Sequence, residues 1–327
     1  MKIFITGADG MLGSHIVREV LERGHEAKAF LLPGSPSKAL DGLDVGRFYG
    51  NILNPEEVND AMEGCDAVIH AAADTNVWPS RSEKTRAINI DGTKNLVSAA
   101  RAWKAKRFVH VGSGSSFGIG PKDKPGDESS PFTGHRYGLD YVDSKYDGQQ
   151  FVLQAYRETG FPAIVVAPTF MFGPHDSKPG SGAMIIAAYQ GKLPAVAPGG
   201  KNFVHVKDVA VAATNALTMG RLGECYIAGH QNLSYSEITA IIADELKSVA
   251  PRLQAPAALL KAVGLAGSFM GNVLGITPKL SYPMAVVACD GQYYSPRKAV
   301  AELGMPQTDI RVAIREAFDW FRSNGYC

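Results

Sequence analysis

Residues 6–13 read Thr-Gly-Ala-Asp-Gly-Met-Leu-Gly (TGADGMLG) and join a short apolar run at 2–6 to a segment with helical periodicity. Glycines at such a turn let the backbone reverse tightly, approach a pyrophosphate and pack a helix closely on a strand. The start of the helix also presents free N–H groups and the positive end of its dipole. The stretch therefore predicts a dinucleotide-binding turn, with a plain strand-to-helix turn as the alternative. The cofactor contacts predicted in it are Gly7, Asp9, Gly10, Met11, Leu12 and Gly13.

Outward from this turn, short apolar runs alternate with helix-period segments as far as residue 168. The runs occupy residues 2–6, 26–32, 46–50, 66–73, 107–113 and 162–168. Strands that alternate with helices favour right-handed crossovers and a parallel sheet with helices on both faces. The sequence thus predicts an α/β fold of the Rossmann type, with a doubly wound parallel sheet.

Beyond Pro168 the alternation is less regular, and residues 168–182 are rich in proline and glycine, which is typical of a loop. We expect a dinucleotide-binding domain at residues 1–170, to which residues 203–228 return as a further strand and helix. Residues 171–202 and 229–327 are expected to form a smaller, mostly helical substrate-binding domain.

The chain has 327 residues, of which 45% are hydrophobic and 20% charged, and its net charge is +1. This balance is ordinary for a soluble globular protein and lacks the charge footprint of a protein that binds nucleic acid or an anionic membrane. The four cysteines lack paired spacing and the eight histidines lack ligand spacing, which argues against a metal site or a disulfide framework. Unpaired cysteines and the absence of a basic-then-apolar leader predict a cytoplasmic protein.

The longest apolar stretch, residues 255–274, is interrupted by Lys261, Ser268 and Asn272. These polar residues make it a poor membrane span, which needs about 20 predominantly apolar residues. We therefore expect no membrane span here, but an amphipathic helix that packs against the protein or covers a substrate pocket.

A tyrosine and a lysine stand four residues apart in segment 140–148, which reads DYVDSKYDG. On a helix, this spacing puts Tyr141 and Lys145 on one face, about one turn apart. Taken alone, such a pair is more often part of a solvated helix face than of a catalytic site. The other motifs of the chain decide between these two interpretations.

The motifs and their order resemble the extended short-chain dehydrogenase/reductase family over almost the whole chain. The glycine fingerprint of that family matches residues 6–13, and its Tyr-x-x-x-Lys element matches Tyr141 and Lys145. Further family blocks match residues 70–73 (HAAA), 89–96 (NIDGTKNL), 168–174 (PTFMFGP), 202–210 (NFVHVKDVA) and 295–305 (SPRKAVAELGM). Within the family, the chain is most similar to dihydroflavonol 4-reductases and 3β-hydroxysteroid dehydrogenases.

The resemblance implies hydride transfer to or from nicotinamide C4, with proton transfer at the substrate oxygen. Tyr141 would be the general acid in reduction or the general base in oxidation. Because a free phenol has a pKa of about 10, Lys145 is expected to lower that pKa and to hold the nicotinamide ribose. A serine that stabilises the substrate oxygen is placed by the family register at Ser113, with Ser115 as the alternative and Ser116 as a weaker one.

The second strand ends in Phe30-Leu31-Leu32-Pro33, which offers neither the carboxylate that binds NAD nor an arginine for the NADP phosphate. Because Lys38 follows in the loop, we expect NADP(H) rather than NAD(H), although Asp9 would disfavour the extra phosphate. The resemblance implies six further cofactor contacts: Asn51, Ile52, Ala71, Ala72, Ala73 and Pro168.

The family contains sugar-nucleotide epimerases and dehydratases as well as reductases of ketones, flavonoids and steroids. The epimerases usually carry an asparagine where this chain has Phe170, and often an arginine near Lys201. An apolar side chain beside a diphosphate would forfeit charge-assisted hydrogen bonds. An apolar pocket is instead expected from Trp78, Ser115, Phe117, Phe170 and Met171.

The resemblance thus implies an NAD(P)-dependent oxidoreductase that acts on an apolar ketone or secondary alcohol. The alternative is an NAD-dependent sugar-nucleotide epimerase or dehydratase. A third possibility is a non-catalytic dinucleotide-binding regulator, although such proteins typically lack the Tyr–Lys pair. The implied partner is a small molecule and not a nucleic acid, and the family implies a homodimer paired through residues 87–103 and the helix of Tyr141.

Overall fold

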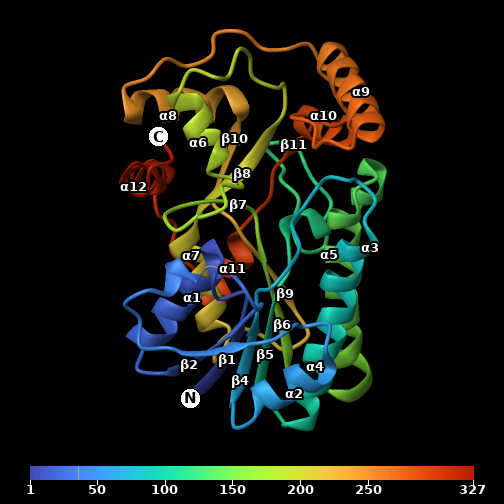
Figure 1. Ribbon diagram of the computed structural model, residues 1–327, viewed down its shortest axis with the longest axis vertical. Coiled ribbons are helices and arrows are strands. Elements are labelled where there is room, and N and C mark those ends of the chain that lie inside the picture. The colour runs from blue at the N-terminus through green and yellow to red at the C-terminus, as the bar shows by residue number, and fades with distance from the viewer. Residues whose placement is uncertain (36) are drawn as a thin grey trace.

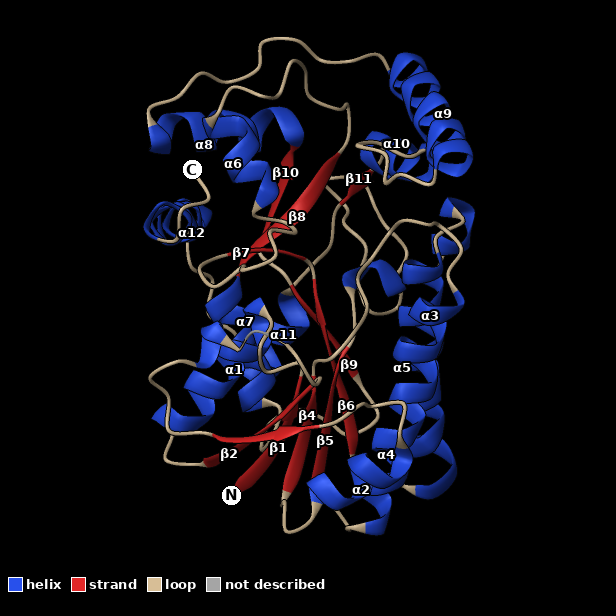
Figure 2. Cartoon of the chain, in the orientation of Figure 1, coloured by secondary structure: helices blue, strands red, loops and turns tan. Residues whose placement is uncertain are grey.

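A seven-stranded parallel sheet dominates the structure, a computed structural model that describes residues 1–35 and 37–327 (Figures 1 and 2). Its strand order is β3-β2-β1-β4-β5-β6-β9. The strands are β1 (Lys2–Thr6), β2 (Glu26–Leu31), β3 (Gly46–Tyr49), β4 (Ala67–His70), β5 (Arg107–Val111), β6 (Ala163–Pro168) and β9 (Cys225–Ala228). The order reverses between β1 and β4, and at such a point doubly wound folds hold their ligands beyond the carboxyl ends of the strands.

Helices cover both faces of this sheet, as the apolar runs predict. Ile3 and Ile5 of β1 pack toward one helical layer, whereas Phe4 packs toward the other, because successive strand residues point to opposite faces. The first layer contains α1 (Met11–Glu22), α7 (Val206–Asn215) and α11 (Arg297–Leu303). The second contains α2 (Pro55–Met62), α4 (Gly92–Ala102) and α5 (Asp140–Thr159). Strands buried on both faces are apolar throughout, which explains the continuous apolar runs. The predicted fold class is confirmed.

A smaller domain with its own sheet lies beyond the carboxyl ends of the large sheet (Figure 2). Its strands are β7 (Phe170–Phe172), β8 (Gly200–His205), β10 (Gln231–Ser234) and β11 (Gly291–Gln292), with β8 paired to the other three. Its helices are α6 (Ala183–Tyr189), α8 (Tyr235–Leu246), α9 (Ala257–Leu274), α10 (Tyr282–Cys289) and α12 (Ile310–Ser323). The domain is therefore built from strands as well as helices.

Two segments lie in a different place from the one expected. The expected return of residues 203–228 to the large sheet begins only at α7, because residues 203–205 belong to β8 in the small sheet. Conversely, α11 lies in the segment 229–327 but packs under the large sheet through Ala299 and Leu303. The strands of both sheets are mainly apolar, and so are the helix faces that pack on them. The sequence pattern of a segment therefore does not reveal which of the two domains it joins.

Helix α9 stands at the upper right of Figure 1, beside α10. Of the residues that the structure describes, this is the one helix long and apolar enough to cross a membrane, with a mean hydropathy of 1.4 and 11% of its window buried. The helix differs from the amphipathic one expected, because its large apolar side chains are exposed and its buried residues are Gly264 and Gly271.

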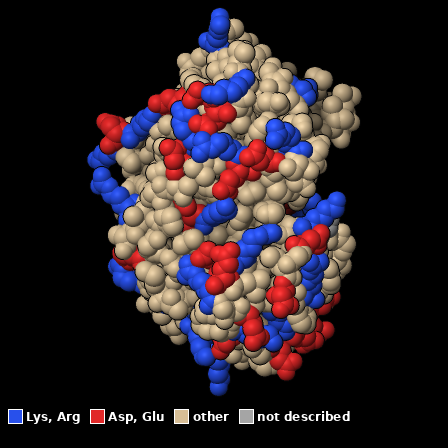
Figure 3. All heavy atoms as spheres, turned by 90° about the vertical axis from the view of Figure 1, so that its left-hand side faces the viewer, with Lys and Arg blue, Asp and Glu red and all other residues tan. Residues whose placement is uncertain are grey.

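Charged side chains of both signs are interspersed over the face that lies on the left of Figure 1 and is turned toward the viewer in Figure 3. A mixed surface of this kind agrees with the net charge of +1 and offers no single-sign field to a polyanion.

Candidate active site

Tyr141 and Lys145 lie in the first two turns of α5, on the side that faces the large sheet. Lys145 is buried, with a relative exposure of 6%, and its Nζ donates a hydrogen bond to the carbonyl oxygen of Val111 at 2.7 Å. Val111 is the last residue of β5. The lysine is thereby anchored at the carboxyl end of a central strand, next to the position of the phenol.

Ion pairs fix the start of α5. The guanidinium of Arg81 donates to Asp140 at 3.0 Å and to Asp143 at 3.1 Å, and the backbone N–H of Ser82 donates to Asp140 at 2.6 Å. Two carboxylates in the first turn also complement the positive end of the helix dipole. These contacts hold the turn that carries Tyr141 to the loop after β4.

Burial shifts the pKa values of the pair in opposite directions. It lowers the pKa of Lys145 to about 8, because the ammonium is desolvated. It raises the pKa of Tyr141 above its usual value, and the hydrogen bond with Ser113 only partly opposes this. The lowering expected from Lys145 is not found, because desolvation of the phenol and its hydrogen bond with Ser113 set the shift. Tyr141 keeps its proton at neutral pH, which suits a general acid.

The two candidate serines lie together after β5. Ser113 Oγ is 2.8 Å from Ser115 Oγ and also accepts a hydrogen bond from the backbone N–H of Ser115 at 3.3 Å. Both residues line a cavity that also contains Tyr141. Ser116 does not line the cavity; its hydroxyl is buried and has no partner within the part of the chain that the structure describes.

This cavity has a volume of about 220 Å³ and is mainly apolar. The predicted site residues that it brings together are Ser113, Ser115, Tyr141, Pro168 and Phe170. The residues not assigned to the pocket from the sequence are Val77, Gly114, Leu139, Val142, Thr169, Lys201, Asn202, Met284, Val287, Gln292 and Tyr294. Three of these residues had a sequence signal, since Lys201 stands near the arginine of the epimerases, and Thr169 and Asn202 lie in the family blocks at 168–174 and 202–210.

Three predicted pocket residues lie outside the cavity. Phe117 is buried in the core below the large sheet, and Met171 packs against the opposite core. Trp78 does not line the cavity either; its indole lies against Gly271 of α9. An aromatic or methionine residue beside a motif thus serves packing as readily as binding.

Lys201 brings a cation into the apolar cavity. Its Nζ contacts Gln292 Oε1 and lies 5.6 Å from the centre of the Phe170 ring. Within residues 1–35 and 37–327, no carboxylate lies within 4.0 Å of it. Burial lowers its pKa to about 8, although Asp290 opposes this shift. The cavity therefore contains a desolvated cation suited to an anionic or strongly polar group of a ligand.

Replacing Lys201 by methionine is expected to increase the free energy of unfolding by about 1–3 kcal/mol at pH 7, because a half-buried, desolvated charge without a carboxylate partner is removed. Below pH 8 the lysine is charged in both folded and unfolded chains, so the cost is present in full. As the pH rises from 8 toward 10, the folded protein loses the proton first and the gain shrinks. Urea unfolding of the wild type and of Lys201→Met at pH 7 and pH 9 measures the difference in their free energies of unfolding. A difference that is larger at pH 9 than at pH 7 would contradict the prediction.

The glycine turn has the shape that a pyrophosphate requires. Gly7 has a φ of +67°, and a Cβ there would lie 2.7 Å from the backbone nitrogen of Ala72. A Cβ on Gly13 would lie 1.9 Å from the carbonyl oxygen of Gly7. Gly10 begins α1 without a side-chain cap and without acidic residues in the first turn, so N–H groups at the helix start are free. The turn fits a dinucleotide, which Gly7, Gly10, Met11, Leu12 and Gly13 would hold.

The segment after β4 is fixed beside this turn. The backbone N–H of Ala72 donates to Thr6 Oγ1 at 3.2 Å. Asn89, in a π-helical turn at Ala87–Asp91, donates to Ser144 Oγ at 2.9 Å and to the carbonyl oxygen of Asp74 at 3.0 Å. The same side chain thus connects the segment containing Ala71–Ala73 with the turn of α5 between Tyr141 and Lys145.

The residues at the adenosine end are spread over three loops. Ser35 donates a hydrogen bond to the Asp9 carboxylate, while Lys38 is exposed at the start of a short 3-10 helix, Lys38–Leu40. Asn51 uses its side-chain oxygen to accept from the N–H of Leu53 at 3.0 Å. Ile52 lies against Gly92 of α4. None of them lines the cavity, and their contacts with a coenzyme stay predictions.

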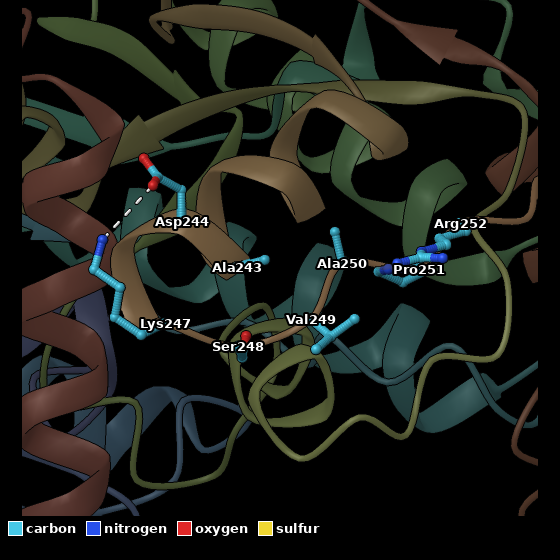
Figure 4. A pocket seen from close by; sticks show the side chains of 8 residues that line it. All are labelled: Ala243, Asp244, Lys247, Ser248, Val249, Ala250, Pro251 and Arg252. Atoms are coloured by element: carbon cyan, nitrogen blue, oxygen red, sulfur yellow. Dashed lines mark ion pairs between the residues drawn. The ribbon is translucent and has the colours of Figure 1, made fainter.

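A second hollow lies at the end of α8 and is lined by residues 243–252 (Figure 4). It contains the ion pair between Asp244 and Lys247, at 3.7 Å. It is shallow and contains none of the predicted site residues. No group of three or more His, Cys, Asp or Glu suited to a metal occurs among the residues that the structure describes.

Known proteins share both the sequence and the fold. A model of the NAD dependent epimerase/dehydratase family matches residues 3–229. A Synechocystis sp. protein named as a dihydroflavonol 4-reductase is 30% identical and covers 99% of this chain and 95% of its own. A 2-alkyl-3-oxoalkanoate reductase from Stenotrophomonas maltophilia is 28% identical, with 96% of this chain and 98% of its own covered.

Two further relatives have different activities in their names. A 3 beta-hydroxysteroid dehydrogenase/isomerase from Mycobacterium tuberculosis is 28% identical over 54% of this chain and 48% of its own. The crystal structure of PA4631, a nucleoside-diphosphate-sugar epimerase from Pseudomonas aeruginosa, superposes with a TM-score of 0.82 at 27% identity, covering 100% of this chain and 99% of the other. The match over residues 3–229 and the relatives that span the chain show that this protein belongs to the NAD dependent epimerase/dehydratase family, as an NAD(P)-dependent reductase or dehydrogenase of its extended short-chain type.

Proposed function

We propose that the chain reduces an apolar ketone that carries a second oxygen function, with Tyr141 as the proton donor. The observation that carries the proposal is a protonated, half-buried phenol in the same apolar cavity as two serine hydroxyls and a desolvated lysine. A phenol with a raised pKa is a poor base at neutral pH but a competent acid, which favours reduction over oxidation.

In this mechanism the Tyr141 hydroxyl donates its proton to the carbonyl oxygen of the substrate. Ser113 or Ser115 donates a hydrogen bond to the same oxygen and stabilises the charge that develops on it. Lys145 holds the nicotinamide ribose and keeps positive charge near the phenol as its proton leaves. The nicotinamide, when bound, supplies the hydride. The apolar cavity wall excludes water from the reacting carbonyl.

The second oxygen function is proposed to be a carboxylate bound by Lys201, which makes the substrate an apolar 3-oxo acid or a close analogue. Two facts support this. Lys201 and Gln292 place a cation and an amide in an otherwise apolar wall. The full-length relative from S. maltophilia is named for the reduction of 2-alkyl-3-oxoalkanoates. A charge-assisted hydrogen bond to a carboxylate is also stronger than a neutral one.

A panel of substrates tests this function by absorbance of the reduced nicotinamide. A long-chain 3-oxo acid, the corresponding methyl ketone and a UDP-sugar are compared with wild type and with Lys201→Met. The wild type is expected to prefer the acid over the ketone by about tenfold or more, and Lys201→Met to lose that preference while still reducing the ketone. Equal activity of wild type on acid and ketone would refute the role of Lys201, and epimerisation of the UDP-sugar without ketone reduction would refute the function.

We propose NADP(H) as the coenzyme. The second strand ends without a carboxylate, and the exposed Lys38 lies in the loop that follows. Arg47 of β3 reaches the same loop, where it donates to Ser37 Oγ at 3.0 Å and pairs with Asp41 at 3.4 Å. The opposing Asp9 carboxylate is engaged by Ser35. Two cations at this loop favour the 2′-phosphate.

Lys38→Ala is expected to raise the KM for NADPH by about tenfold and to leave the KM for NADH unchanged, because only NADPH carries the 2′-phosphate that the ammonium would contact. The exposed Lys192→Ala is the matched control, remote in sequence from the loop. Initial rates with both coenzymes measure the effect. Equal changes for NADPH and NADH would show that Lys38 does not read the phosphate.

A further inference from the structure

Helix α9 presents its large apolar side chains to the outside. The exposed fractions run from 51% to 69% for the residues Leu259, Val263, Leu265, Phe269, Met270, Val273 and Leu274, and Ile276 follows at 49%. At 100° per residue, the exposed positions cover an arc of about 200°. Exposed apolar patches of this kind on a soluble chain mark an interaction site.

Packing fixes this orientation. The inner face of α9 consists of small residues, and a Cβ added at Gly264 would lie 2.7 Å from Ala285 Cβ of α10. One at Gly267 would lie 2.2 Å from the carbonyl oxygen of Leu280, and one at Gly271 would lie 2.6 Å from the Trp78 ring. Because the glycines allow this close contact, α9 cannot turn its apolar arc inward without a clash. The exposed arc therefore belongs to the native arrangement.

The charges of the chain segment that contains α9 are of one sign. From residue 246 to residue 289 the sequence contains no aspartate or glutamate, whereas it contains Lys247, Arg252, Lys261 and Lys279, of which Lys247 pairs with Asp244 of α8. The loop that leads into α9 also exposes Val249 at 75% and Leu253 at 68%. Apolar and cationic residues without acidic ones suit an anionic lipid surface.

We propose that α9 and the loop 247–256 dock onto an anionic lipid bilayer, with the helix lying in the plane of the interface. A bilayer accommodates a convex apolar arc, whereas a protein partner would need a groove to enclose it. Because α10 covers the inner face, α9 does not enter the bilayer as a spanning helix.

The docked surface lies beside the cavity. α9 packs on α10, whose Met284 and Val287 line the cavity, and its Gly271 meets Trp78, the neighbour of the lining residue Val77. An apolar substrate dissolved in the bilayer would thus reach the cavity at the membrane surface. This consequence rests on the proposed function, whereas docking itself does not.

Sedimentation with vesicles tests the docking without substrate or coenzyme, so that its result is independent of catalysis. The vesicles contain three parts phosphatidylcholine to one part phosphatidylglycerol, or phosphatidylcholine alone. The wild type is expected to bind the anionic vesicles, more weakly at high salt, and the double variant L265E/F269E to bind at least about tenfold more weakly. The double variant M219E/V300E, which puts two charges on exposed apolar positions elsewhere, is expected to bind like the wild type.

Thermal unfolding and coenzyme binding of both double variants show that they are folded. Failure of the wild type to bind anionic vesicles overturns the proposal. So does a loss of vesicle binding that is equal in both double variants. If L265E/F269E instead converts a larger oligomer into a smaller one in analytical ultracentrifugation and the wild type binds no vesicles, a second copy covers α9 and the proposal is wrong.

Discussion

Replacing Tyr141 by phenylalanine is expected to lower the turnover of ketone reduction by about 10²–10⁴-fold, the contribution that a positioned general acid makes. The substitution removes one oxygen from a residue that lines the cavity beside Ser113 and Ser115. Neither of the other proton donors of the described cavity lining is expected to replace it, because burial raises the pKa of Tyr294 and Lys201 is engaged by Gln292. Coenzyme affinity should stay unchanged, because the glycine turn and Lys145 are intact.

Single-turnover kinetics and coenzyme fluorescence measure these two effects separately. Tyr146→Phe is the matched control, since Tyr146 lies on the same helix but stacks on Phe132, with ring centres 4.1 Å apart, outside the cavity. It should retain the activity of the wild type. A Tyr141→Phe enzyme that turns over at the rate of the Tyr146→Phe enzyme would show that the phenol is not the proton donor.

Replacing Gly13 by alanine is expected to weaken coenzyme binding by about 100-fold or more, which corresponds to about 2.7 kcal/mol, and to lower the free energy of unfolding by about 1–3 kcal/mol. The added Cβ would lie 1.9 Å from the carbonyl oxygen of Gly7 and 2.7 Å from its carbonyl carbon. Both are backbone atoms, so the start of α1 would have to move away from the turn. The free N–H groups at that start would then no longer face a pyrophosphate.

Gly180→Ala is the control for this substitution. A Cβ at Gly180 meets no atom within 4 Å, and its φ lies outside the left-handed region. Coenzyme titration and urea unfolding of the two variants give the comparison. If Gly13→Ala binds NADPH and NADH as tightly as Gly180→Ala does, the glycine turn does not hold the pyrophosphate.

The larger domain was predictable because its signals are local. Apart from the exposed edge strand β3, the strands of the large sheet are buried on both faces and therefore mostly apolar. The glycine turn has one steric requirement at Gly7 and another at Gly13. The Tyr141–Lys145 spacing likewise depends only on one helix. Each of these features follows from residues that are close together in the sequence.

The cavity was harder to predict because its wall comes from distant segments. Leu139, Lys201, Met284 and Gln292 meet only after the small sheet has formed. Phe117 and Trp78 were expected in the pocket on their proximity to motifs, but packing of the core and of α9 uses them instead. Side-chain direction in loops is set by these long-range contacts, which no local pattern encodes.

The direction of the Tyr141 pKa shift also required the structure. From the spacing alone, the ammonium of Lys145 is expected to make the phenol more acidic. In the fold both groups are desolvated, and the ammonium donates to the carbonyl of Val111. Burial therefore raises the pKa of Tyr141, so the phenol is protonated at neutral pH, which is the form that a general acid needs.

Transfer of deuterium tests the central claim most directly. The enzyme is incubated with a long-chain 3-oxo acid and with NADPH or NADH that carries deuterium at both C4 positions, and the product is examined by mass spectrometry. We predict one deuterium on the new carbinol carbon and one coenzyme oxidised for each alcohol formed. Unchanged coenzyme and no deuterium in any alcohol, together with epimerisation of a UDP-sugar by the same preparation, would contradict the account.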